Sequence, residues 1–100
     1  MQQLNSNLFQ SIVGQPLTVC HPDTGLELAI LTLNKVLVNH QAPAHYDAFS
    51  LILAGDQDRH LFQGTYLFKH VDFGEAVLFM TPNAIDHYQI VMCMSVNGAA

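Results

Sequence analysis

The alternation of apolar and polar positions divides the chain into one short helix followed by strands. In the opening LNSNLFQSIVG, apolar residues recur three and four positions apart, with Asn5 or Ser6 as the cap and Gly14 at the end. This spacing predicts a helix of about two turns. The rest of the chain has the pattern of strands separated by turn residues. The predicted strands cover residues 17–21, 26–38, 48–54, 64–70, 75–81 and 88–96.

The last three predicted strands each have one apolar face, and these faces are expected to meet in one core. The residues predicted to point inward are Tyr66, Phe68, His70, Ala76, Leu78, Met80, Tyr88, Ile90, Met92, Met94 and Val96. Six mostly antiparallel strands with short glycine turns predict a mainly β fold, a meander that curls into a small antiparallel barrel or rolled sheet. The helix is expected to cap an open end or to pack on Leu31 and Leu33. We find no second domain and no repeat, so residues 1–100 are predicted to form a single β-rich domain.

The second predicted strand is apolar on both faces, which an edge strand covered only by water does not tolerate. Only 11% of the residues are charged, although 50% are apolar. Such a surface carries fewer charges than soluble monomers usually do, so part of it is expected to be covered. We predict a homodimer or larger closed oligomer, with an unknown protein partner as a further possibility. The interface candidates are Leu31, Leu33, Leu37 and Val91.

Charge and hydropathy exclude several other partners. The chain has three Lys and Arg residues, spread along the sequence, against eight Asp and Glu residues, and a net charge of -5. Phosphate contacts need clustered cations, so nucleic acid is excluded.

Neither a signal peptide nor a membrane span is expected, which predicts a cytoplasmic protein. Cys20 and Cys93 lack the spacing of a zinc or redox motif and are expected to be free thiols, with a structural disulfide as the alternative.

Six histidines raise the question of a metal site. In an up-and-down meander, His21, His60 and His87 lie at one end of the sheet, and His40, His45 and His70 at the other. No zinc-motif spacing is present, so His21, His60 and His87 are weak candidates and no metal or cofactor is expected.

The sequence also has no motif of a catalytic nucleophile or of phosphate binding. The serines lie in no nucleophile elbow and the glycines form no phosphate loop. We therefore predict that the protein is not an enzyme.

A series of residues in the second half of the chain resembles a known pattern. It comprises Gln63, Gly64, Tyr66, His70, Gly74, Leu78, Phe79, Pro82 and Tyr88. The series is similar to QGTYxLxHxxxGxxxLFxxP, the core motif of a family of small bacterial proteins of unknown function that look associated with phage-tail-collar-type genes. The resemblance implies no catalytic residues. Cys93 departs from it, because the family pattern ends there in Asn.

The motif residues have sufficient structural roles. Gly74 is predicted to take the left-handed position of a hairpin turn, Gly64 to let a strand start beside a neighbouring backbone, and Pro82 to end a strand. Tyr66 and His70 are predicted to bond buried backbone near the barrel mouth. The predicted function is a non-enzymatic interaction or structural module, such as an accessory of a phage-tail-like assembly. The alternative is a small-molecule or metal-binding barrel, which requires an open cavity lined by Tyr66, Phe68 and His70.

Overall fold

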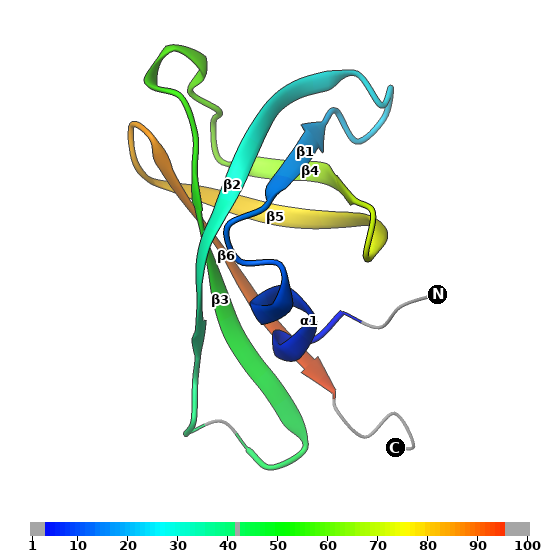
Figure 1. Cartoon of the computed structure of the whole chain (residues 1–100), viewed down its shortest axis with the longest axis vertical. Helices are drawn as coiled ribbons and strands as arrows, with labels where there is room; N and C mark the ends of the chain where they lie inside the picture. The colour runs from blue at the N-terminus through cyan, green and yellow to red at the C-terminus, as the bar shows by residue number, and fades with distance from the viewer. Residues whose placement is uncertain (1–3, 42, 96–100) are drawn as a thin grey trace.

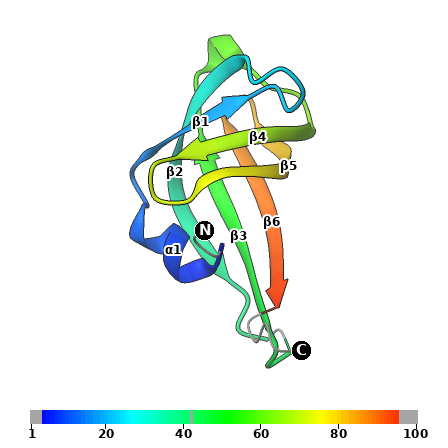
Figure 2. The ribbon, with the colours of Figure 1, turned by 90° about the vertical axis from the view of Figure 1, so that its right-hand side faces the viewer.

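Six antiparallel strands form a closed barrel with one short helix beside it (Figures 1 and 2). The computed structural model describes residues 4–41 and 43–95. This architecture confirms the predicted fold class. The elements are α1 (Ser6–Ser11), β1 (Pro16–Cys20), β2 (Glu27–Val38), β3 (Tyr46–Ala54), the 3-10 helix η1 (Gln57–Arg59), β4 (Gly64–His70), β5 (Gly74–Ala84) and β6 (His87–Ser95).

The strand order differs from the predicted up-and-down meander. Around the barrel it is β1-β2-β3-β6-β5-β4. Two three-stranded meanders, β1–β3 and β4–β6, are joined by the antiparallel pairs β1–β4 and β3–β6. The order is unchanged when the two meanders are exchanged, so the barrel has a topological two-fold symmetry. Local alternation identifies strands but carries no signal for these long-range pairings, and for this reason the meander prediction was wrong.

The two meanders also share the sequence of their first turn, a similarity that our sequence reading missed. His21–Gly25 and His70–Gly74 both read His-x-Asp-x-Gly. The glycines have φ of +75° and +79°, as predicted for Gly74. The amide of Asp23 donates to Nδ1 of His21 at 3.1 Å, and the amide of Asp72 donates to Nδ1 of His70 at 2.9 Å. Each imidazole therefore caps its own turn.

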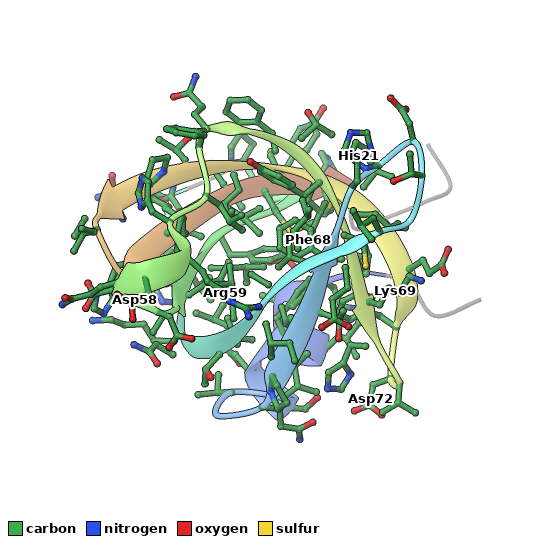
Figure 3. The ribbon with its side chains drawn as sticks, turned by 90° about the horizontal axis from the view of Figure 1, so that it is seen from above. His21, Asp58, Arg59, Phe68, Lys69 and Asp72 are labelled. Carbon is green, nitrogen blue, oxygen red and sulfur yellow. The ribbon has the colours of Figure 1, made fainter. Side chains whose placement is uncertain are left out.

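Side chains from all six strands fill the barrel. Figure 3 looks down the barrel and shows Phe68 inside the ring of strands, where it is fully buried. The interior also holds Leu17, Val19, Leu31, Leu33, Leu51, Leu53, Met80, Tyr88 and Ile90. Met92 is buried and Met94 packs against this core, so the inward placement of these methionines is confirmed. Val96 lies outside the described residues.

A bulge in β2 reverses the face that we predicted for its apolar residues. In the pairing with β3, Leu33 lies opposite Leu53 but Lys35 lies opposite Ile52, so Asn34 is an extra residue. Because one extra residue exchanges the two faces of a strand, the inward positions change from odd to even numbers at this point. Leu31 and Leu33 are buried, at 1% and 0% exposed, and the prediction that they lie on the outer surface was wrong.

The helix α1 lies against β2 and β3 (Figure 1), and its cap and its anchor explain this position. The Asn5 side chain accepts from the Leu8 amide at 2.8 Å, as a helix cap does. The amide of Ser6 donates to Asp47 of β3 at 2.7 Å. Phe9 is fully buried between Phe49 and Phe73, with ring centroids 5.8 and 5.6 Å away. The helix thus closes the core between β3 and the β4–β5 turn.

Three further positions differ from their predicted roles. Pro82 lies inside β5, at a register shift, and does not end the strand. A Cβ on Gly64 would meet only the Tyr66 ring at ordinary contact distance, so Gly64 is not required by close packing. The close approach is instead at Gly55, where a Cβ would collide with the buried Leu31 side chain.

Candidate functional site

Several of the motif residues and two of the three metal candidates lie at or near one end of the barrel. They belong to the β3–β4 connection, the first residues of β4 and the β5–β6 turn. These segments come together because β5 pairs with both β4 and β6. The residues are His60, Gln63, Gly64, Tyr66, His87 and Tyr88, and we call them the barrel-end cluster.

Tyr88 is the buried centre of this cluster. It is 0% exposed, and its hydroxyl accepts from the Leu61 amide at 2.9 Å. Its ring stacks on the His60 imidazole with centroids 5.7 Å apart. A buried tyrosine requires a partner for its hydroxyl, and here the partner is the backbone of the β3–β4 connection. Tyr88 therefore fixes that connection to the barrel.

The His60 side chain is hydrogen-bonded to the backbone of the β5–β6 turn. Its Nδ1 lies 3.0 Å from the Ile85 carbonyl, and since a carbonyl only accepts, Nδ1 carries the proton. The same nitrogen lies 3.4 Å from the Tyr88 hydroxyl. Phe62, 78% exposed, meets the imidazole edge-on at 5.9 Å. His60 thus links the β3–β4 connection to the β5–β6 turn.

Tyr66, near the start of β4, is a second tyrosine whose hydroxyl bonds to the backbone of the β3–β4 connection. Its hydroxyl donates to the Phe62 carbonyl at 2.7 Å. Burial, and next the neighbouring Tyr88, raise the pKa of the Tyr66 phenol above its ordinary value. A raised pKa keeps the hydroxyl protonated, as its donor role requires. The bond spans four residues and shapes the entry of the chain into β4.

Asp86 and His87 form the polar part of the β5–β6 turn. Oδ1 of Asp86 lies 2.8 Å from Nδ1 of His87. This hydrogen bond, with a smaller contribution from Gln57, lowers the pKa of the Asp86 carboxyl. The Asp86 carbonyl also accepts from the Gly55 amide at 2.8 Å. The pair therefore stabilises the turn that joins β5 and β6.

The structure separates the predicted metal candidates. His21 lies at the β1–β2 turn, on the opposite side of the barrel from Asp58 and Arg59 in Figure 3, while His60 directly follows Arg59. Nδ1 of His21 accepts from the amides of Asp23 and Thr24. Within residues 4–41 and 43–95, no three His, Cys, Asp or Glu side chains are grouped to hold a metal ion. Cys20 and Cys93 are both free.

His70 belongs to a different region from the barrel-end cluster. Its Nε2 lies 2.8 Å from Oε1 of Gln15, so Nε2 donates while Nδ1 accepts from Asp72. Its ring stacks on Phe73, with centroids 5.6 Å apart. His70 therefore ties the β4–β5 turn to the segment between α1 and β1.

The outer face of the barrel is the second candidate region. Leu37, Phe79 and Val91 point outward and are 50%, 53% and 74% exposed, and Phe79 and Val91 line one surface pocket; we call these three residues the outer patch. The register places Leu37 opposite Ser50 of β3, and Ser50 opposite Val91 of β6. Leu37 and Val91 therefore share a face with one strand between them. A gathering of apolar side chains on a sheet face is typical of an interface.

Comparison with known families gives a match, over residues 4–92, to the model of DUF6916, a domain of unknown function. The chain belongs to the DUF6916 family. It matches no curated protein and no solved structure with significant similarity. The function of this DUF6916 chain must therefore be inferred from the geometry of its own barrel.

In this DUF6916 chain the barrel-end cluster has a mechanical role. The polar contacts of His60, Tyr66 and Tyr88 end on backbone or on one another, and they hold the β3–β4 connection and the β5–β6 turn together. Gln63 is exposed and Gly64 starts β4. Sequence reading found most of the cluster through the motif but missed Leu61 and Ile85, whose contributions are backbone atoms and leave no side-chain signal. Among the described residues, no helix is long and apolar enough to cross a membrane.

Proposed function

We propose that this DUF6916 protein is a non-enzymatic interaction module that works as a homo-oligomer through its outer patch. The observation that carries the proposal is the exposure of Leu37, Phe79 and Val91 in a chain with only eleven charged residues. Burial of such side chains contributes about 25 cal/mol for each Å² removed from water. The net charge of -5 opposes unlimited growth, which favours a closed oligomer.

The placement of Tyr66, Phe68 and His70 supports this proposal over a ligand-binding barrel. A ligand cavity lined by Tyr66, Phe68 and His70 would need all three side chains at one opening. Phe68 is fully buried in the core, while Tyr66 and His70 are bonded to Phe62 and Gln15, at separate places. The accessory role in a phage-tail-like assembly, which the sequence resemblance implies, likewise requires a non-enzymatic module that binds protein surfaces.

The proposal is tested by light scattering coupled to size exclusion at micromolar concentrations. The wild-type protein is expected to have at least twice the 11.1 kDa mass of one chain. Val91→Lys introduces a charge into the outer patch and is expected to shift the protein toward monomer. Ile30→Lys is the matched control, because Ile30 is 55% exposed on β2, outside the patch, and it is expected to leave the mass unchanged. An 11.1 kDa species at every concentration would overturn the proposal.

A further inference from the structure

Strands β5 and β6 separate soon after the turn that joins them. Their pairing comprises Thr81 with Gln89, Pro82 with Tyr88 and Ala84 with His87. Beyond the Thr81–Gln89 pair, residues 74–80 of β5 pair only with β4, and residues 90–95 of β6 pair only with β3. Figure 2 shows the two strands diverging. Residues 90–94 of β6 therefore have one edge with no strand of the described chain beside it, which we call the β6 edge.

The core is less well covered next to the β6 edge than elsewhere. Ala76, Leu78 and Met94 point inward but are only partly buried, whereas Leu33 and Leu53 are 0% exposed. A surface pocket of about 330 Å³ opens where β5 and β6 part; it is lined by Phe79, Thr81, Gln89 and Val91. The helix α1 lies against β2 and β3 and leaves this gap uncovered. The gap is where an additional strand would complete the coverage.

The β6 edge lacks the features by which proteins protect an open edge. Such edges usually carry a lysine, a proline, an inward charge or a bulge. Residues 88–95 contain no charged residue and no proline. The pairing of β6 with β3 runs from Tyr46–Ser95 to Ala54–His87 without a register shift. A regular, uncharged strand whose backbone groups on one edge pair with no strand of residues 4–41 and 43–95 is suited to pairing with another strand.

We infer that the β6 edge pairs in antiparallel orientation with the β6 edge of a second copy of this chain. This inference rests on the proposed function and specifies its contact. An antiparallel strand paired with its own copy is self-complementary, so one two-fold axis satisfies both edges. A second copy needs no complementary charge, and the uncharged edge lets two chains of net charge -5 meet without like charges in contact.

The inference includes a register in which the two-fold axis lies near the middle of the β6 edge. A two-fold axis at Met92, the middle of residues 90–94, places Val91 of one chain opposite Cys93 of the second copy. Both side chains point outward, and Cys93 is exposed in the described chain. The resulting sheet would continue from β2 and β3 through β6 into the second copy and would cover Val91 of the outer patch.

Amide hydrogen exchange of the wild-type oligomer tests the edge directly. In an antiparallel strand, successive amides point to opposite neighbours. If only β3 pairs with β6, every second amide in residues 90–94 exchanges fast; if the β6 edges pair, all five are protected, and dilution to monomer releases only alternate ones. The internal reference is Phe49–Leu51, which pairs on both sides within one chain and is expected to stay protected. Fast exchange of alternate edge amides in an oligomer would overturn the inference, would leave the edge free for another partner, and would not affect the proposed function.

A disulfide variant tests the register. Val91→Cys is expected to form a covalent dimer with Cys93 of the second copy under mild oxidation, because opposite side chains in an antiparallel pair have Cβ atoms about 5 Å apart. Ile30→Cys, 55% exposed on β2 and outside the outer patch, is the matched control and is expected to remain unlinked. Equal linkage in the two variants, or none with Val91→Cys, would overturn the register centred on Met92. A monomer by light scattering would instead overturn the proposed function.

Discussion

The two halves of the barrel, β1–β3 and β4–β6, follow one plan but end differently. Each begins with a short strand and a His-x-Asp-x-Gly turn, and each continues through a long strand into a third. In the first half, β2 and β3 remain paired as far as Val38 and Phe49. In the second half, β5 and β6 pair only from Thr81 to Ala84 on β5. The same topology thus gives one continuous sheet and one open gap.

The segments that precede the two halves account for this difference. Before β1, the amide of Gly14 donates to the Leu33 carbonyl at 2.7 Å, and the Leu33 amide donates to Gln15 at 3.1 Å. These bonds extend the pairing of β2, and α1 then covers its inner face. Before β4, the chain instead turns across the barrel end, where Tyr88 and His60 hold it. No comparable segment among the described residues covers β6, and its edge stays open.

The largest effect is expected from removing the helix anchor of the first half. Phe9→Ala is predicted to lower the free energy of unfolding by about 3–5 kcal/mol, the usual cost of truncating a fully buried phenylalanine. Phe62→Ala is the control, because Phe62 is 78% exposed and should cost under about 1 kcal/mol. Denaturant unfolding measures both. Similar losses in the two variants would mean that α1 does not hold the core of the first half together.

The equivalence of the two turns predicts equal costs for their glycines. Gly25→Val and Gly74→Val should each destabilise the fold by about 1–3 kcal/mol, because a β-branched residue does not readily adopt positive φ. A Cβ added at either glycine would meet no atom of the described residues within 4 Å, so the cost is in the backbone alone. Gly25→Asn and Gly74→Asn should recover most of it, since asparagine tolerates this region. Thermal unfolding compares the four variants, and a large difference between the turns would break the comparison.

Much of the fold could be predicted because alternation is a local property. The bounds of β4 agree with the pattern, and the helix begins at the predicted cap, Asn5. Strand order was not accessible, since the pairs β1–β4 and β3–β6 join residues far apart in sequence. The bulge at Asn34 was also hidden, because asparagine in the middle of an apolar strand reads as an ordinary outward position. Because of this one extra residue, Leu31 and Leu33 face the core, whereas Leu37 faces outward.

The candidate site was predicted only where side chains carry the signal. Tyr66 and Tyr88 stood out in the motif, and the structure places both at the barrel end. Their partners are the Phe62 carbonyl and the Leu61 amide, which any residue could supply. Leu37 and Val91 were predicted to share an outer face, and the register agrees. The gap between β5 and β6 has no sequence signal, because it depends on how far the two strands stay paired and on which other strands they pair with.

A smaller effect separates the two turn histidines. His70→Ala should cost about 1–2 kcal/mol, because the ring caps its turn, bonds Gln15 and stacks on Phe73. His21→Ala should cost less, under about 1 kcal/mol, since only the contacts within its own turn are lost. His70→Asn is the control that keeps a local acceptor and removes the stacking. Denaturant unfolding at neutral pH compares them, and a greater loss at His21 would contradict this assignment.

The smallest effect is a pH dependence at Asp86, in the turn that joins β5 and β6. The hydrogen bond from His87 lowers the pKa of the Asp86 carboxyl below its ordinary value of 3.8, so the folded protein binds fewer protons there than the unfolded chain. Asp86 therefore contributes stability above its unfolded pKa, and this contribution is lost as the pH falls through the lower, folded value. Asp86→Asn keeps the carbonyl that accepts from Gly55 and removes the titration. Wild type should exceed Asp86→Asn in stability at about pH 6, and the difference should shrink toward about pH 2. Because the pair is partly exposed, the difference is expected to be small and to weaken in salt. A difference that stays constant between these pH values would show that the carboxylate of Asp86 gains no stability from His87.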